Sequence, residues 1–165
     1  SHGLPCGGDT SSSLLPTVYN TTIGDSKMGR TIGAFFAGFL MAMAVVILCQ
    51  SLNLVLYPLP EGLDPQDTEA LTLHIANSPT GALLGVLTSY FFGSFAGGAV
   101  ATRIAKDQRA GIAIGVVLLL GGLSNLAKIP HPLWFEVSST LIYLPSAWIG
   151  SQLAMRRLHQ DSLAS

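Results

Sequence analysis

The chain has 165 residues, of which 49% are hydrophobic and only 10% are charged. A soluble domain carries about 25% charged residues to cover its outer faces, so this composition excludes an ordinary soluble protein. The formal net charge of −1 also gives no electrostatic basis for binding nucleic acid. The sequence therefore predicts an all-α, polytopic membrane protein whose surroundings are a lipid bilayer.

Residues 1–27 form a polar N-terminal segment that is rich in Ser, Thr, Gly and Pro and shows no helical periodicity. A secretory signal peptide would begin with a cationic stretch and continue with an apolar core, and this segment has neither. Met28 is a candidate initiator, which leaves two interpretations open. The segment is either a fusion remnant or a native N-terminal region.

The first apolar run covers about residues 31–57 and contains no charged residue. At 1.5 Å per residue it is roughly 40 Å long, which is enough to cross a hydrocarbon core of about 30 Å. After this run, Asp64 followed by Pro65, with Asp67 close behind, predicts the start of a short helix over about residues 65–76. We expect this helix to lie at the outer surface, between spans one and two.

The second span covers about residues 79–102 and carries a ladder of small residues at every fourth position. In a bilayer such residues form a groove against which another helix can pack. A four-residue repeat overshoots each helical turn by about 40°. The two halves of the ladder should therefore face different neighbours, or one neighbour that crosses with right-handed geometry. The helix-packing residues predicted in spans two and three are Gly81, Gly85, Ser89, Gly93, Gly97, Gly111, Gly115 and Gly122.

The third span covers about residues 110–127 and the fourth about residues 133–155, with a tight reversal between two prolines joining them. Arg156 and Arg157 end the fourth span, and residues 158–165 form a tail. Residues 28–157 are thus predicted to form an antiparallel bundle of four transmembrane helices, in addition to the short outer helix.

Basic residues are distributed unevenly between the two ends of this bundle. With four spans, Lys128 is the one basic residue on its side of the membrane. By the positive-inside rule, both termini are predicted to be cytoplasmic, in a bacterial cytoplasmic membrane. The basic residues of the opposite side are Lys27, Arg30, Arg103, Lys106, Arg109, Arg156 and Arg157.

Eight polar residues are predicted to gather near the outer leaflet, around one vestibule. Glu136 would lie roughly 6 Å below the start of its helix, where a carboxylate must be paired, hydrated or protonated. In one interpretation it is a proton-exchanging or cation-binding group, with Lys128 or His131 as its partner. In the other, Glu136 and Lys128 form an ion pair that ties the turn together while the amides cap helix ends. The eight residues are Gln50, Asn53, His74, Asn77, Asn125, Lys128, His131 and Glu136.

The sequence contains no GxSxG, HExxH, Walker or dinucleotide-binding motif, so no catalytic residue, metal or cofactor is predicted. Our leading hypothesis is a non-enzymatic protein that acts through helix packing, as a homo-oligomer or as an accessory subunit bound to other membrane subunits. Its basis is that four helices offer too few neighbours for so many small-residue faces. The alternatives are a small transporter or ligand-binding protein with its site around Glu136, and a membrane enzyme that acts on a lipid or quinone.

Overall fold

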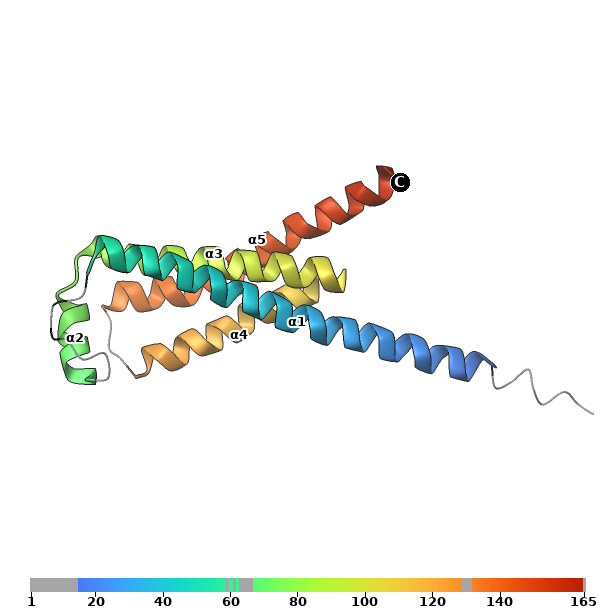
Figure 1. The fold of residues 1–165 in the computed structure, drawn as a ribbon, viewed down its shortest axis with the longest axis horizontal. Helices are drawn as coiled ribbons and strands as arrows, with labels where there is room; N and C mark the ends of the chain where they lie inside the picture. Colours follow the sequence, from blue (N-terminus) through green and yellow to red (C-terminus); the bar gives the residue numbers. More distant parts are fainter. Residues whose placement is uncertain (1–14, 59, 61, 63–66, 129–131, 165) are drawn as a thin grey trace, which may run out of the picture.

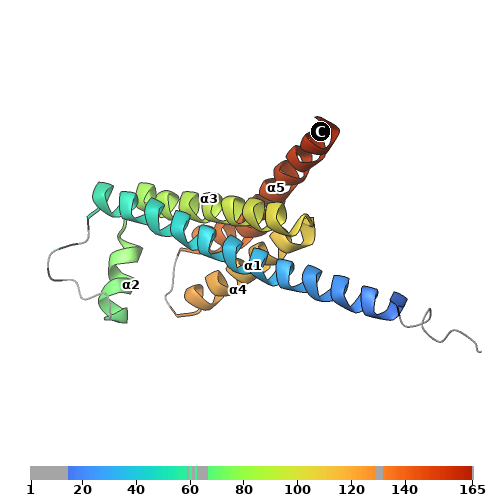
Figure 2. The ribbon, with the colours of Figure 1, turned by 45° about the vertical axis from the view of Figure 1, so that its right-hand side comes forward.

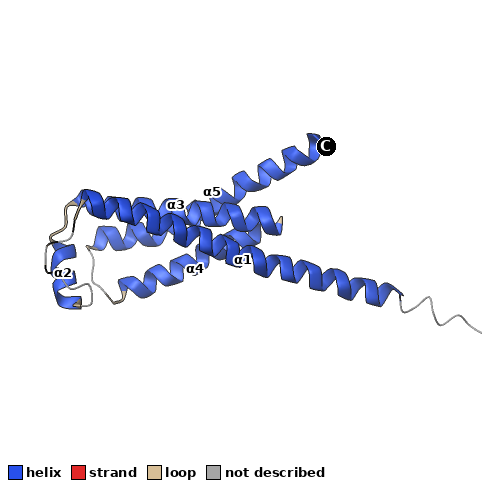
Figure 3. Ribbon diagram, in the orientation of Figure 1, coloured by secondary structure: helices blue, strands red, loops and turns tan. Residues whose placement is uncertain are grey.

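The computed structural model describes residues 15–58, 60, 62, 67–128 and 132–164. Within these residues the chain is helical and contains no strand, which confirms the predicted class (Figure 3). The helices are α1 (Leu15–Leu56), α2 (Thr68–Ala76), α3 (Thr80–Ala105), α4 (Gln108–Leu126) and α5 (Leu133–Ala164).

Three of the described helical segments are long and apolar enough to cross a membrane. They are Lys27–Leu56 within α1, the whole of α3 and the whole of α4. The fourth predicted span lies in α5, which is not among them. The structure therefore supports a helical, membrane-integrated protein with at least these three apolar helices.

The first helix is longer than the sequence pattern predicts. α1 begins at Leu15 and has 42 residues, so its length is about 63 Å. The polar N-terminal segment is thus helical from Leu15 onward, although its sequence shows no helical periodicity. Once a helix has formed, each added residue gains a backbone hydrogen bond, so it can continue into a polar segment. The N-terminal part of α1 and the C-terminal part of α5 both project beyond the bundle, at the end opposite α2 (Figure 1).

The short helix α2 begins at Thr68, slightly later than predicted, because Asp67 is its N-cap. The Asp67 carboxylate accepts hydrogen bonds from the backbone N–H groups of Glu69 and Ala70, at 3.0 and 3.2 Å. These bonds satisfy amides that a helix N-terminus leaves without an intrahelical partner. α2 lies across one end of the bundle, beside the last turn of α1 and the first turn of α3 (Figures 1 and 2).

α3 is the central helix of the bundle. It contacts α1, α4 and α5, and α1 also contacts α4. No contact joins α1 to α5 within the described residues. α3 therefore contacts α1 on one side and α5 on another. We name the two ends of the bundle by the segments that lie there. The α2 end contains α2, and the basic end contains the α3–α4 connection with Arg103, Lys106 and Arg109.

The buried core differs between these two ends. At the basic end its members are nearly all alanines: Ala34, Ala42, Ala101, Ala105, Ala110 and Ile114. At the α2 end they are the larger Leu83, Leu87 and Phe135. Because the distance between packed helices depends on the side chains at their contact, α1, α3 and α4 approach closely at the basic end. α1 and α4 cross there and separate toward α2 (Figures 1 and 2).

α1 presents a broad apolar surface away from the bundle. The exposed fractions of Leu40 and Val55, for example, are 66% and 79%. In water such a surface would mark a binding site or an aggregation hazard, but in a bilayer it is the surface that faces lipid. Other exposed residues of this surface are Ile32, Phe36, Leu48 and Leu52.

Candidate functional site

The small-residue ladder of α3 packs against α1 along its whole length. A methyl group added to Gly97 would lie 2.8 Å from both the Ala42 Cβ and the backbone oxygen of Gly38, so α1 and α3 are in direct backbone contact there. The partners run in opposite order along the two helices, as an antiparallel pair requires. They are Gly81 with Tyr57, Gly85 with Asn53, Gly93 with Val46, and Gly97 with Ala42.

Both halves of the ladder thus face the same neighbour. The sequence pattern left two arrangements open. The one in which the two halves of the ladder face different helices is wrong. Other faces of α3 contact the remaining helices. A methyl group added to Gly98, for example, would meet the backbone of Ala147 in α5.

The predicted packing glycines of α4 are also occupied from inside the chain. Gly111 lies against Ser151 and Thr102, Gly115 against Ala147, and Gly122 against Tyr143. Ser89, the one serine predicted for packing, is fully buried in α3 and donates its hydroxyl to the backbone oxygen of Val86. The small residues predicted for packing in α3 and α4 thus have neighbours inside the chain, and α3 contacts three helices.

Hydroxyl groups are buried where α3, α4 and α5 meet. The Ser151 hydroxyl donates to the backbone oxygen of Ala147 at 2.7 Å, within its own helix. The hydroxyls of Ser94 and Thr102 are buried and have no hydrogen-bond partner in the described part of the chain. Nearer the α2 end, the rings of Tyr90 and Tyr143 stack with centroids 5.2 Å apart. These groups lie inside the helix contacts, so we assign them to packing.

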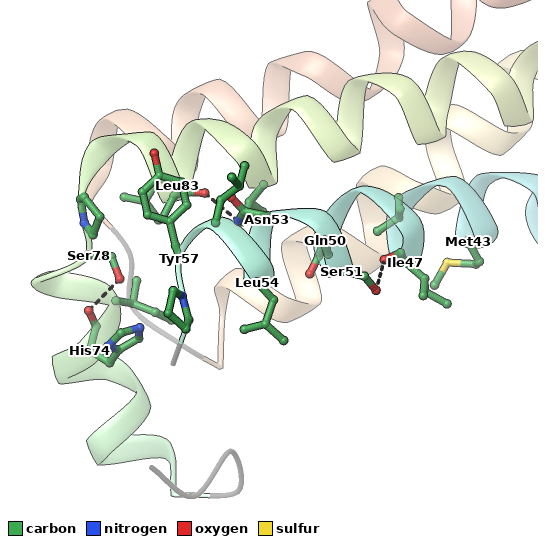
Figure 4. Close-up of a pocket in the computed structure, with 17 residues that line it drawn as sticks. Met43, Ile47, Gln50, Ser51, Asn53, Leu54, Tyr57, His74, Ser78 and Leu83 are labelled. Carbon is green, nitrogen blue, oxygen red and sulfur yellow. Dashed lines mark hydrogen bonds between the residues drawn. The ribbon is translucent and has the colours of Figure 1, made fainter. Parts of the chain in front are cut away.

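A pocket of about 890 Å³ opens at the α2 end, between α1, α2 and the start of α3 (Figure 4). One face of α1 forms its longest wall, and residues on that face recur at the three- and four-residue spacing of a helix. The α1 wall consists of Met43, Val46, Ile47, Gln50, Ser51, Asn53, Leu54 and Leu56. The remaining lining residues are Tyr57, Pro58, His74, Ile75, Ser78, Pro79, Ala82, Leu83 and Val86.

Local sequence signals hold the α2 side of this pocket in place. Asn77 is the C-cap of α2 and Pro79 is the N-cap of α3, so only a short link separates the two helices. The Ser78 hydroxyl donates to the backbone oxygen of His74 at 2.9 Å. The same carbonyl also accepts the backbone N–H of Asn77 at 3.2 Å, so both bonds together close the last turn of α2. His74 is therefore presented to the pocket from a fixed helix end.

The polar groups of the pocket fall into two sets. Asn53 donates its amide to the backbone oxygen of Ala82 at 3.0 Å, and Ser51 donates its hydroxyl to that of Ile47 at 2.8 Å. Like the Ser78 hydroxyl, these two side chains are already hydrogen-bonded to the backbone of the protein. The Gln50 amide, the His74 imidazole and the Tyr57 hydroxyl make no hydrogen bond to any described residue. These three are the polar side chains of the lining that no other described residue engages.

The structure brings together three of the eight polar residues that the sequence predicts as a site. Gln50, Asn53 and His74 line the pocket, and each comes from a different turn or helix. Asn77 is exposed and donates its side-chain amide to the backbone oxygen of Leu73. It does not line the pocket.

The other four predicted residues belong to the α4–α5 side of the bundle. Asn125 and Lys128 are exposed near the end of α4. Glu136 is half-buried in the first turn of α5, where its backbone oxygen accepts the hydroxyls of Ser139 and Thr140. His131 lies outside the described residues. The pocket is therefore built without Glu136, around which the sequence hypothesis was centred.

The apolar part of the lining was missed at the sequence level. Met43, Val46 and Ile47 lie deep in the longest apolar run, where every residue suits lipid contact equally well. The signal that was present is the spacing of Gln50 and Asn53, which places both on one side of α1.

No family model, curated protein or solved structure matches this chain. Among the described residues, no three His, Cys, Asp or Glu side chains are grouped so that they could hold a metal ion. The pocket at the α2 end is accordingly the feature on which a functional proposal can be built.

Proposed function

We propose that this chain is a small integral membrane protein that binds an amphiphilic ligand from the bilayer, in the pocket between α1, α2 and α3. The observation that carries the proposal is the lining of that pocket. The Gln50 amide and the His74 imidazole, which make no hydrogen bond to any described residue, lie beside a long apolar wall. A ligand that suits both surfaces has a polar head and a hydrocarbon chain.

α4 takes no part in the pocket. It separates from α1 toward α2 (Figures 1 and 2), and none of its residues lines the pocket. On this stretch of α4, Leu120 and Leu123 are exposed, and a methyl group at Gly121 would meet nothing within 4 Å. A lipid could enter from the hydrocarbon region without leaving the bilayer.

We include α5 in the membrane domain as a fourth span, with both termini on the cytoplasmic side of a bacterial cytoplasmic membrane. No charged residue occurs between Glu136 and Arg156. The low hydropathy of this stretch comes largely from hydroxyl side chains, and these are bonded to carbonyls of their own helix, which lowers the cost of placing them in lipid. The donors are Ser138, Ser139, Thr140, Ser146 and Ser151.

Cysteine labelling tests this topology. In a background with Cys6 and Cys49 replaced by serine, Met28→Cys and Ser162→Cys are treated with a membrane-impermeant maleimide in sealed vesicles of one orientation. With four spans, both cysteines react from the same side of the membrane. If they react from opposite sides, α5 does not cross.

The pocket itself is tested by filling it. Ser51 lines the pocket, whereas Ser124 in α4 does not, yet both are exposed serines whose hydroxyls donate to the carbonyl four residues earlier. Ser51→Phe and Ser124→Phe are therefore matched variants. We expect Ser51→Phe to lower the binding of single-chain oleoyl amphiphiles at least tenfold, measured by native mass spectrometry from detergent. Equal binding by the two variants would contradict the proposal.

An oligomer or accessory subunit is the second candidate, and one observation favours it. Near the basic end of α1, methyl groups added to Gly29 and Gly33 would meet nothing within 4 Å, so this small-residue face is unused by the chain. Exposed Met28 and Ile32 lie next to it. Under this hypothesis Gly33→Leu should lower the oligomer mass in native mass spectrometry, whereas Gly121→Leu should leave it unchanged.

A further inference from the structure

We infer that the ligand of the pocket is a lipid with an uncharged, hydrogen-bonding head group and one acyl or isoprenoid chain. This inference rests on the proposed function and names the chemical class of its ligand. It is argued from the charge of the lining, from the order of polar and apolar residues along the pocket, and from the depth of the pocket.

No charged side chain lines the pocket within the part of the chain that the structure describes. The described lining contains no Asp, Glu, Lys or Arg, and its one titratable group besides Tyr57 is the imidazole of His74. Of the acidic residues described near it, Asp67 and Glu69 are exposed at the opposite end of α2. An ionised group that leaves water needs a partner of opposite charge, or its transfer is very costly. A phosphate, carboxylate or ammonium head group would find no such partner among the described lining residues.

The polar residues are arranged at one end of the pocket. Gln50 lies partway along α1 and His74 lies at the α2 end, as Figure 4 shows. Beyond Gln50, toward the basic end, the wall consists only of Met43, Val46 and Ile47. A neutral imidazole offers one donor and one acceptor, and a glutamine side chain offers two donors and one acceptor. The head group therefore lies between Gln50 and α2, and the chain follows α1 toward Met43.

The pocket has room for a head group and the first part of one hydrocarbon chain. From Met43 to Tyr57 the wall on α1 is about 21 Å long, and the apolar part from Met43 to Gln50 makes up about 10 Å of that length. A volume of about 890 Å³ is typical of sites that take one small ligand. Leu83 and Val86 of α3 add to the apolar lining, and we assign one chain to this path.

Three probes that share an oleoyl chain separate the head-group inference from the proposed function. They are monoolein, which is neutral, oleate, which is anionic, and oleoyl lysophosphatidylcholine, which is zwitterionic. We expect monoolein to bind the full-length protein at least tenfold more tightly than either charged probe, in competition experiments read by native mass spectrometry. Equal affinities, or a preference for a charged probe, would overturn the head-group inference and leave the proposed function standing. If none of the three binds, both fail.

A charge introduced into the pocket provides the second test. Gln50→Lys places a cation beside the head group, so we expect its preference to change from monoolein to oleate by about tenfold. The matched control is Asn125→Lys, which adds the same charge at an exposed amide in α4 that does not line the pocket. Gln50→Leu, which adds no charge, should weaken monoolein binding severalfold. If Gln50→Lys and Asn125→Lys have the same selectivity, Gln50 does not contact the head group and the inference is wrong.

Discussion

The two ends of this bundle are built from the same helices but differ in how closely these approach. At the basic end, alanine and glycine side chains let α1, α3 and α4 meet with their backbones nearly in contact. At the α2 end, Leu83, Leu87 and Phe135 fill the space between α3 and α5. There α1 keeps α3 as its partner but moves away from α4, and the pocket opens beside it. Close packing at one end thus goes together with a cavity at the other.

This comparison shows how one helix bundle can be closely packed at one end and leave a cavity at the other. Helices in lipid associate through packing and hydrogen bonds, since lipid tails and apolar side chains are equally apolar. The small residues concentrate that association along the α1–α3 pair. α4 is then free to diverge from α1 at the α2 end without loss of the central contact.

The largest effect is expected at the tight end. Gly97→Ala places a methyl group 2.8 Å from the backbone oxygen of Gly38, and Ile114 of α4 closes the space at 3.1 Å. Because a backbone atom cannot move aside as a flexible side chain can, we expect the free energy of unfolding to fall by about 2 kcal/mol. The measurement is reversible unfolding in mixed micelles of detergent and dodecyl sulfate.

Gly33→Ala is the control for that prediction, since nothing lies within 4 Å of a methyl group there. Alanine is the better helix former, so this variant should lose no stability. If the two substitutions have the same effect, close approach does not hold the basic end together.

A smaller effect is expected where the α1–α3 contact borders the pocket. Asn53→Ala removes the hydrogen bond to the backbone oxygen of Ala82 and the contact with Gly85. Interhelical hydrogen bonds in membranes contribute about 1 kcal/mol, so we expect a loss of that size. Hydrogen exchange should rise in the last turns of α1 and stay unchanged at the basic end. Asn125→Ala, at an exposed amide, should do neither.

The smallest effect has the opposite sign. The buried hydroxyl of Thr102 lacks a hydrogen-bond partner within the described chain, and valine has the same shape without the hydroxyl. Thr102→Val should therefore raise the free energy of unfolding by about 0.5 kcal/mol. Ser151→Ala, which removes a buried hydroxyl that does donate a bond, should lower it. A loss of stability in Thr102→Val would show that this hydroxyl has a partner, such as a bound water.

The candidate site could be predicted only in part. Gln50, Asn53 and His74 were identified because polar residues at the ends of apolar runs are conspicuous. The grouping of these three with Glu136 assumed that all residues at one end of a bundle share one space. Because α1 and α4 diverge toward α2, residues of α1 and residues of the α4–α5 side do not share one space. We attribute this divergence to the different side-chain volumes at the two ends of the bundle.

By itself, the sequence determined the helical class, the approximate extent of α2, α3 and α4, and α3 as the helix with a packing groove. Hydrophobic runs, caps and small-residue spacing are local, so they can be recognised one segment at a time. Only the tertiary structure decided that the whole groove belongs to α1, that the predicted packing glycines of α4 have neighbours inside the chain, and that a pocket opens at the α2 end. These features depend on which helix lies beside which, and at what distance, and no single segment carries that information.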